Sequence, residues 1–241
     1  MSDRGYVDVN VQVGPRTGGA RGAPLEDVLG ERRSHGIAVS LVRHRTALLA
    51  EADLGNRQLL EMCESEPGLR PIVVLSVDRS GEADPVRGLG DRVAGYWLEG
   101  RASPGISLSA EPLLRSAAAT GRPLLVPIEG WGSAARVGAA TADLGVPVVL
   151  IGSHYNTSVD DLAAGRRYEH LHFDTSSMAH FRAIETAVRM VGTERVLLGT
   201  GSPLRSIQSS LNAILSAAID DDAKLAILAG NAGRLFGLPV G

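Results

Sequence analysis

An alternating stretch near the start of the chain constrains its fold more than any other feature. Residues 6–14 read YVDVNVQVG, so four valines alternate with an aspartate, an asparagine and a glutamine. A period of two predicts a β-strand with the valines on one face and the polar side chains on the other. Three polar side chains on one face are costly to bury unless they find hydrogen-bond partners or line a cavity. Two interpretations stay open: an edge strand with one wet face, or a barrel strand whose inward face opens into a site.

Strand-like and helix-like segments alternate about eight times along the remaining sequence. The expected strands are residues 6–14, 37–42, 69–78, 94–99, 123–129, 146–151, 171–175 and 195–199. The expected helices are residues 25–33, 53–64, 111–120, 133–144, 159–166 and 180–191, a short one within 84–92, and two or three segments within 207–236. This alternation predicts a parallel sheet covered on both faces. Eight repeats in 241 residues favour an α/β fold of the (β/α)8 TIM-barrel type, in one domain spanning residues 1–241.

The totals exclude several classes of function. A formal net charge of -3 gives no electrostatic case for binding nucleic acid or an anionic membrane. Cys63 is the single cysteine, so neither a disulfide framework nor a cysteine metal cluster is expected. No apolar run approaches about 20 residues, so we expect no membrane span, and a cytoplasmic protein is the default.

Six stretches together resemble the amidohydrolase superfamily, in particular its amidohydrolase-related branch of decarboxylases and lactone hydrolases. The closing stretches 191–203 (VGTERVLLGTGSP) and 231–238 (NAGRLFGL) are the most specific. The other four are residues 7–14, 33–37, 95–98 and 173–176. The resemblance runs in order over nearly the whole length and implies an amidohydrolase-type barrel.

The resemblance also implies a divalent metal at the C-terminal end of the barrel. In that family the ligands are typically a His-x-His pair ending the first strand, histidines after the fifth and sixth strands, and an aspartate after the eighth. Here Asn10 and Gln12 occupy the first two positions, residues 127–129 contain no histidine, and Gly201 stands at the aspartate position. Only His154 matches a family histidine. Neutral amides are poor ligands for zinc and its relatives, so we expect no catalytic metal and no other cofactor.

The active-site face of such a barrel is formed by the C-terminal ends of the strands. The polar residues expected there are Asn10, Gln12, His44, Asp78, Glu99, Glu129, His154, Asp174 and Ser202. Asn10 and Gln12 either hydrogen-bond each other across the barrel or bind a substrate carbonyl or carboxylate. Glu99, Asp174 and Ser202 are further candidates for substrate binding.

His154 is the leading candidate for proton transfer, because histidine changes its charge near neutral pH. The alternative is a loop histidine in water. Glu129 is a second candidate base, although a lone carboxylate more often pairs with an arginine, and the same ambiguity holds for Glu99. Asp174 lies in an Asp-Thr-Ser element that we interpret as mainly structural. His35, His44, His170 and His180 are expected on helix or loop surfaces.

The leading hypothesis is therefore a metal-independent enzyme that acts on a small carbonyl or carboxylate compound by acid/base catalysis, in a hydrolysis, decarboxylation or rearrangement. A biosynthetic role would suit such a departure from the family. A rival is a non-catalytic barrel that serves as a binding or scaffolding partner, for example for an active homologous protein. The family resemblance and the apolar helices separately suggest a homodimer. A third hypothesis is a new metal site formed by Asp8, His154 and Asp174.

Overall fold

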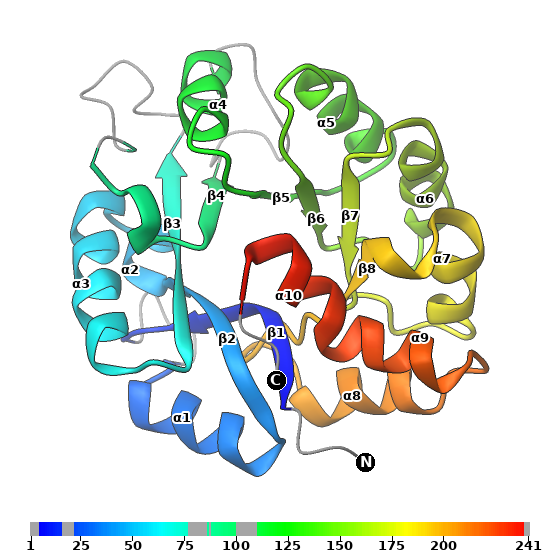
Figure 1. Ribbon diagram of the computed structural model, residues 1–241, viewed down its shortest axis with the longest axis horizontal. Coiled ribbons are helices and arrows are strands. Elements are labelled where there is room, and N and C mark those ends of the chain that lie inside the picture. Colours follow the sequence, from blue (N-terminus) through cyan, green and yellow to red (C-terminus); the bar gives the residue numbers. More distant parts are fainter. Residues whose placement is uncertain (1–4, 16–21, 77–85, 87, 100–109, 239–241) are drawn as a thin grey trace.

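The computed structural model describes residues 5–15, 22–76, 86, 88–99 and 110–238. Eight parallel strands follow one another in sequence order around a ring, with helices outside it (Figure 1). The strands are β1 (Tyr6–Val13), β2 (Ile37–His44), β3 (Leu69–Ser76), β4 (Gly95–Glu99), β5 (Leu124–Pro127), β6 (Val148–Ile151), β7 (Leu171–Asp174) and β8 (Val196–Leu197). Backbone hydrogen bonds from Val9 N–H to the carbonyl of Leu198 and from Gly201 N–H to the carbonyl of Asn10 join β1 to the segment that directly follows β8. The expected (β/α)8 barrel is confirmed.

Helices connect and cover these strands. The α-helices are α1 (Leu25–Ser34), α2 (Arg45–Leu49), α3 (Ala52–Ser65), α4 (Glu111–Ala118), α5 (Ser133–Thr141), α6 (Ser158–Arg167), α7 (Ala183–Val191), α8 (Ile207–Leu215), α9 (Asp221–Leu225) and α10 (Asn231–Phe236). Short turns of other helix types are η2 (Gly90–Arg92), η4 (Thr193–Arg195) and η5 (Ala226–Gly230). Within the expected short helix of residues 84–92, η2 forms at Gly90–Arg92, and residues 84, 85 and 87 lie outside the described residues. No helix in the described ranges is long and apolar enough to cross a membrane.

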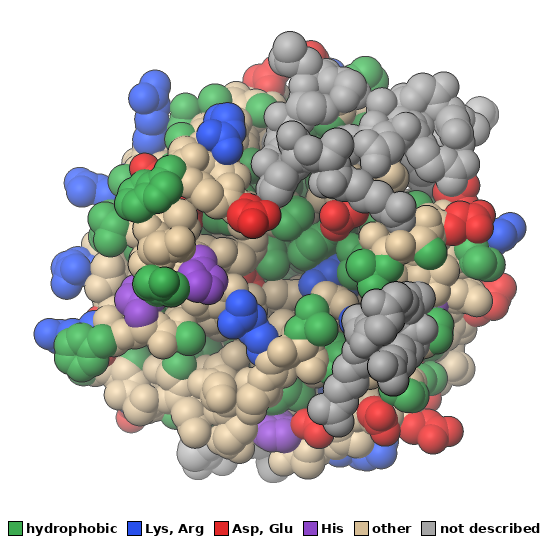
Figure 2. Space-filling model, turned by 180° about the vertical axis from the view of Figure 1, so that it is seen from behind, with side chains coloured by type: hydrophobic (Ala, Val, Ile, Leu, Met, Phe, Trp, Pro, Cys, Tyr) green, Lys and Arg blue, Asp and Glu red, His purple; other side chains and the backbone are tan. Residues whose placement is uncertain are grey.

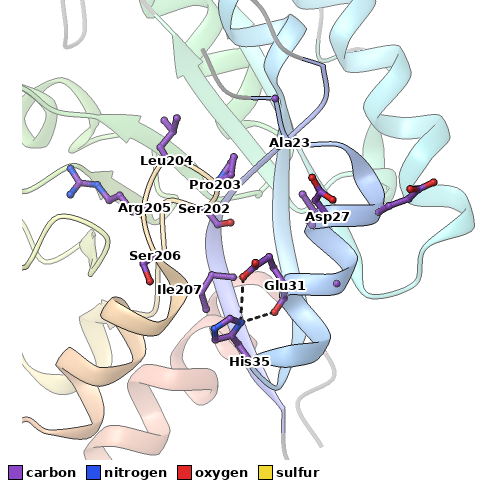
Figure 3. A pocket seen from close by; sticks show the side chains of 14 residues that line it. Ala23, Asp27, Glu31, His35, Ser202, Pro203, Leu204, Arg205, Ser206 and Ile207 are labelled. Atoms are coloured by element: carbon purple, nitrogen blue, oxygen red, sulfur yellow. Dashed lines mark hydrogen bonds and ion pairs between the residues drawn. The ribbon is translucent and has the colours of Figure 1, made fainter. Parts of the chain in front are cut away.

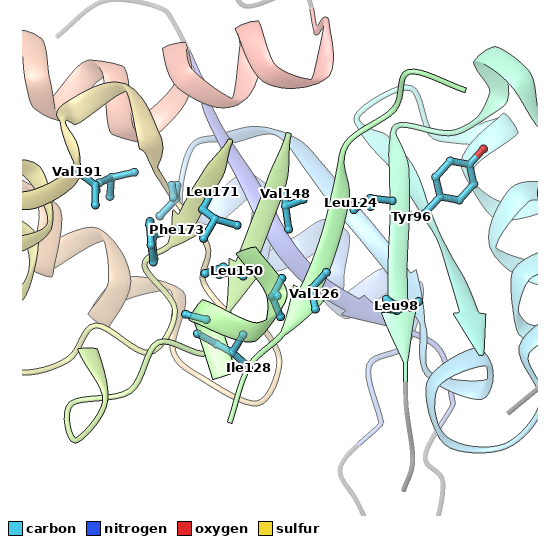
Figure 4. Packing of buried hydrophobic residues seen from close by; sticks show 14 of the residues in the cluster. Tyr96, Leu98, Leu124, Val126, Ile128, Val148, Leu150, Leu171, Phe173 and Val191 are labelled. Atoms are coloured by element: carbon cyan, nitrogen blue, oxygen red, sulfur yellow. The ribbon is translucent and has the colours of Figure 1, made fainter. Parts of the chain in front are cut away.

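The strands carry apolar side chains on both faces, as a parallel sheet between two layers requires. Alternate residues of β4 to β7 pack outward with the covering helices, among them Leu98, Val126, Leu150 and Phe173 (Figure 4). The residues between them in β4, β5 and β6 belong to a second buried cluster in the barrel interior. Phe236 of α10 joins this inner cluster, and Figure 1 shows α10 lying across the middle of the ring. One end of the barrel is therefore closed by α10, which leaves the C-terminal ends of the strands for a site.

The polar face of β1 depends on an irregularity in its pairing with β2. Asp8 pairs with Ser40 and Val11 pairs with Val42, so three steps along β1 match two along β2. Such a β-bulge changes which face the following residues point to. The first two valines of β1 therefore join the inner cluster, and the last two pack with residues of α1 and α3. The expectation that all four valines share one face was wrong, because an alternating sequence gives no sign of an inserted residue.

An asparagine side chain completes the sheet where β2 and β3 diverge. Asn56 of α3 accepts a hydrogen bond from the backbone N–H of Val74 (2.9 Å) and donates one to the carbonyl of Val74 (2.8 Å). The backbone pairing of these strands extends only to Val42 and Pro71. The amide of Asn56 therefore satisfies both polar groups of Val74, which would otherwise be buried without partners.

Asn56→Ala is expected to lower the free energy of unfolding by about 2 kcal/mol, because two buried backbone groups lose their partners. Urea denaturation followed by circular dichroism measures the change. Asn156→Ala, at an exposed loop position, is the matched control and should change stability by less than about 0.5 kcal/mol. Equal stability of the two variants would show that water replaces the Asn56 amide.

Candidate active site at the mouth of the barrel

The C-terminal ends of the strands, here called the mouth, bring together side chains from distant parts of the sequence. The Nδ2 group of Asn10 donates hydrogen bonds to Asp174 Oδ2 (2.8 Å) and to Ser176 Oγ (3.0 Å). All three residues are buried. The other amide atom, Asn10 Oδ1, is also buried and has no hydrogen-bond partner among the described residues. A buried carbonyl oxygen without a partner is an acceptor available to a ligand.

Asp174 is held firmly in this network. Besides Asn10, its carboxylate accepts hydrogen bonds from the backbone N–H groups of Ser176 and Gly152, each at 3.3 Å. Gly199 passes so close that a Cβ at that position would lie 2.3 Å from Asp174 Oδ2. Burial raises the pKa of the Asp174 carboxyl, against the lowering effect of these hydrogen bonds. The side chain is thus fixed in place and costly to ionise.

Asp8 lies deeper and links β1 to the segment after β8. Its Oδ1 accepts from the backbone N–H groups of Asn10 and Thr200, both at 3.0 Å. Its Oδ2 accepts from the Thr200 hydroxyl at 2.5 Å. Burial raises the pKa of Asp8 to about 6, with a further contribution from the charge of Asp174. The carboxylate holds the bulged backbone of β1 in the conformation that presents Asn10.

A buried arginine lies beside these carboxyl groups. Arg43, at the end of β2, is 4% exposed, and its guanidinium carbon lies 3.9 Å from the ring centre of Trp97. Trp97 Nε1 in turn donates to Glu99 Oε2 (2.7 Å). Burial lowers the pKa of Arg43 to about 10, and the nearby charges of Asp174, Glu99 and Asp8 oppose that shift. Arg43 therefore carries a positive charge at neutral pH.

A second arginine fixes the last polar residue of β1. Arg45 Nη1 donates to Gln12 Oε1 at 2.9 Å, and Arg45 is 1% exposed. Gln12 and Asn10 therefore find separate partners and do not hydrogen-bond each other. Figure 2 shows the face of the molecule opposite α10. This face is hollowed near its centre, and acidic and basic side chains lie at the border of the hollow.

The predicted site residues fall into two groups. Asn10, Gln12, Glu99 and Asp174 come together in the mouth, through the contacts described above. Ser202 is buried and contributes backbone bonds, because its N–H donates to Thr200 Oγ1 and its carbonyl accepts from the Gln12 N–H.

His154 and Glu129 form the second group and are exposed, on the loops that follow β6 and β5. Neither contacts the Asn10 network directly in the described residues. The expectation of a surface His44 was wrong: the residue is buried, and its ring accepts a hydrogen bond from Thr46 N–H at the start of α2. Asp78 lies outside the described residues.

A second concave surface lies away from the mouth. It is a groove of about 700 Å³ on the outside of the barrel, between α1 and the segment that leads into α8 (Figure 3). Asp27, Glu31 and His35 line one side, and Ser202 and Ser206 the other. His35 is tied to the carbonyl and carboxylate of Glu31. These groups are already partnered or exposed, so the groove lacks the buried unpartnered groups that the mouth has.

The donor set of the mouth does not suit a divalent metal ion. No three His, Cys, Asp or Glu side chains gather in a metal-binding arrangement within the described part of the chain. The third hypothesis, a site of Asp8, His154 and Asp174, is therefore not assembled. Gly201 brings no ligand, and the cationic Arg43 lies near the two aspartates. A guanidinium next to the ligands would repel a metal cation.

Three residues that the sequence reasoning missed contribute to the mouth: Arg43, Arg45 and Thr200. The two arginines follow the apolar run of β2 with one residue between them, which is a spacing that places both near one strand end. Arginine after a buried strand was the available signal for them. Thr200 had no such signal, because its role depends on the closure of β8 against β1.

Comparisons with known proteins support the fold and extend over nearly the whole chain. No family model and no curated protein matches the sequence. Among solved structures, 2,6-dihydroxybenzoate decarboxylase from Rhizobium superposes with a TM-score of 0.73 at 15% identity, covering 97% of this chain and 99% of the other. A 5-carboxyvanillate decarboxylase from Sphingomonas paucimobilis gives a TM-score of 0.72 at 14% identity, covering 97% and 99%.

An amidohydrolase from Burkholderia multivorans, whose structure contains zinc, gives a TM-score of 0.73 at 13% identity, covering 98% of this chain and all (100%) of the other. The similarity to amidohydrolase-type barrels expected from the sequence is thus confirmed for the fold. At these identities the similarity carries no residue roles to this chain.

Proposed function

We propose that this protein is an enzyme that binds a small carbonyl or carboxylate compound in the mouth and converts it by proton transfer without a metal ion. The observation that carries the proposal is the buried polar network of Asn10 and Asp174, with an acceptor atom left unpartnered and a buried cation close by. Burying such groups is costly, and a core made only for stability would replace them with apolar side chains. Groups kept at this cost suit a binding function.

In this proposal Asn10, Gln12, Glu99, Asp174 and Ser202 line or support the substrate site. Asn10 Oδ1 accepts from a substrate hydroxyl or amino group, since both N–H groups of that amide are already donated, and the Nε2 group of Gln12 donates to a substrate oxygen. Asp174 and Ser202 hold the C-terminal half of β1 in place through their contacts with Asn10 and Gln12. Glu99 fixes the Trp97 ring that forms one wall.

His154 and Glu129 are the proposed proton donors and acceptors. Both follow strand C-terminal ends, so they lie at the same end of the barrel as the network. Exposed side chains on such loops can exchange protons with water and still reach a substrate held in the mouth. Decarboxylation of an aromatic acid, for example, requires one proton to be delivered to the carbon that loses carbon dioxide. Two of the similar structures are decarboxylases of small aromatic acids, which supports hydrolysis or decarboxylation of a small carboxylate as the reaction class.

His154→Gln is expected to lower kcat at least 100-fold with little change in KM, because general acid–base catalysis typically contributes about 100- to 10,000-fold. The assay is mass spectrometry of products from a panel of hydroxybenzoates, unsaturated carboxylic acids and lactones. Glu129→Gln is tested in parallel. His35→Gln, at the end of α1, is the matched control and should retain full turnover.

The same experiment includes elemental analysis of the active protein. Full turnover by His154→Gln would remove that residue from the mechanism. A stoichiometric transition metal in active wild-type protein, together with loss of turnover after chelation, would overturn the metal-free proposal.

A non-catalytic binding partner is the second candidate, and exposed apolar side chains favour it. Trp131, Tyr155, Phe181 and Leu204 lie on the loops after β5 to β8, and each is at least 60% exposed. Large apolar side chains gathered at one end of a protein often mark an interaction surface. This candidate, with a homodimer as its simplest form, is supported if light scattering finds a dimer that Phe181→Ser dissociates and no panel compound is turned over.

A further inference from the structure

Arg43 lies next to a position where the family resemblance implies a metal ligand. Arg43 pairs directly with Gln12 in the register of β1 and β2. Gln12 occupies the second position of the His-x-His pair implied by the resemblance. The arginine side chain therefore leaves the sheet next to a position that would hold a metal ligand, and it reaches the ring of Trp97 on β4.

The guanidinium of Arg43 has an unusual environment for a buried charge. It forms no hydrogen bond or ion pair with any residue that the structure describes, and its Nε is buried without a partner. The guanidinium carbon lies over the Trp97 ring, which is a favourable cation–π arrangement. Stacking of this kind leaves the N–H groups at the edge of the guanidinium free to donate. The carboxyl groups of Asp174, Glu99 and Asp8 lie near enough to act on this charge electrostatically, but none of them accepts a hydrogen bond from it. The N–H donors of Arg43 are therefore available to an acceptor from outside the protein.

We propose that Arg43 is the resident cation of the mouth, that it takes the place of the metal ion, and that it binds the carboxylate of the substrate. A guanidinium can form two parallel hydrogen bonds with a carboxylate, an arrangement that a point charge does not impose. The unpartnered Asn10 Oδ1 requires a hydrogen-bond donor. The favoured ligand is therefore a small carboxylate that also bears a hydroxyl or amino group. The inference extends the proposed function by naming the group that replaces the metal and the class of ligand.

The first test measures binding without turnover. Isothermal titration calorimetry with salicylate, benzoate and glycolate compares the wild type with Arg43→Met, Arg43→Lys and the exposed control Arg189→Met. We expect the wild type and Arg189→Met to bind salicylate more tightly than benzoate. Arg43→Met should lose at least 100-fold in affinity, and Arg43→Lys should fall between them because it keeps the charge but loses the paired donors. Thermal denaturation checks the fold of each variant.

The second test asks whether Arg43 excludes a metal ion. Zinc chloride is titrated into the triple variant Asn10→His, Gln12→His, Gly201→Asp, with and without Arg43→Met. Tight zinc binding is expected only when Arg43 has been removed, because the guanidinium repels the ion. This test gives an answer even when the single variant Arg43→Met is too unstable for the calorimetric experiment.

Three results would overturn the inference. They are equal affinity of Arg43→Met and wild type for salicylate, no binding of any of the three acids by the wild type, and tight zinc binding by the triple variant with Arg43 in place. Binding that depends on Arg43 without turnover of any compound would leave this inference intact and contradict only the proposed catalysis.

Discussion

Gly199→Ala is expected to lower the free energy of unfolding by about 3 kcal/mol or more, since the added methyl has no space. A Cβ at this position would lie 2.3 Å from Asp174 Oδ2 and 3.0 Å from Asp174 Cβ. Asp174 cannot turn away without losing its hydrogen bonds with Asn10 and two backbone N–H groups. The backbone of Gly199 cannot retreat either, because Thr175 Oγ1 both accepts from its N–H and donates to its carbonyl.

Chemical denaturation measures this loss, and Gly30→Ala is the control. Gly30 lies within α1, and a Cβ there would meet nothing within 4 Å. That substitution should stabilise the protein by up to about 1 kcal/mol, because alanine favours a helix more than glycine does. Ligand binding in the mouth should fall in Gly199→Ala and persist in Gly30→Ala. A Gly199→Ala variant as stable as the wild type would show that the Asp174 side chain is not held where it is described.

The fold could be predicted from the sequence because its main signal is periodic. Apolar strands and amphipathic helices alternate, and eight such units in this length favour closure into a barrel over an open doubly wound sheet. The ends of the strands were predicted less accurately. The second strand was expected to stop at Val42, but it continues to His44, and α2 begins at the next residue. A charged pair after an apolar run resembles a loop when only hydrophobicity is considered.

That boundary error hid the most informative residues of the mouth. Arg43 and Arg45 were assigned to a connector, so neither was weighed as part of the site. Asn10, Gln12, Glu99 and Asp174 were placed at the mouth because their strands were recognised and their types are costly to bury. The partners of these residues could not be predicted, since Asp174 meets Asn10 across 164 positions of the sequence. The catalytic roles of His154 and Glu129 stay predictions.

The β-bulge shows a second limit of sequence reasoning. Strict alternation in residues 6–14 suggested one uniform polar face, whereas the structure has an inserted step between Asp8 and Val11. Asp8 stabilises that step by accepting the N–H of Asn10, but the same aspartate in a regular strand would look identical in sequence. The inserted residue is specified by contacts with Thr200, at the other end of the chain.

Asp8→Asn is expected to change how stability depends on pH. Burial raises the pKa of Asp8 from 3.8 to about 6, so between these values the folded protein holds a proton that the unfolded chain has released. Stability contributed by this group is therefore complete below about pH 4 and is lost as the pH rises through about 6. The shift corresponds to about 3 kcal/mol. The variant lacks this loss, so its stability relative to wild type should rise by about 3 kcal/mol between pH 4 and pH 8.

Urea denaturation of both proteins at each pH measures this difference, and the comparison removes other titrating groups. Burial lowers the pKa of His172 to about 4, which makes the folded protein less stable as the pH falls below about 6.5. The pH dependence of stability caused by His172 opposes the one caused by Asp8. It is the same in wild type and in Asp8→Asn, so it cancels in the difference between them. A fixed cost of about 1 kcal/mol for the altered bond to Thr200 likewise shifts the difference by a constant amount.

Asp143→Asn provides the control of opposite sign. Asp143 is exposed and pairs with Arg115, which lowers the pKa of the Asp143 carboxyl. A lowered pKa contributes stability above the unfolded value, so removing this charge should leave the protein slightly less stable at pH 8 than at pH 4, relative to wild type. If the difference between Asp8→Asn and wild type stays constant from pH 4 to pH 8, Asp8 is ionised in the folded protein at little cost. In that case the hydrogen bonds from Thr200 and from the N–H of Asn10 offset the cost of burying the Asp8 charge, and Asp8 holds no proton in the folded protein above about pH 4.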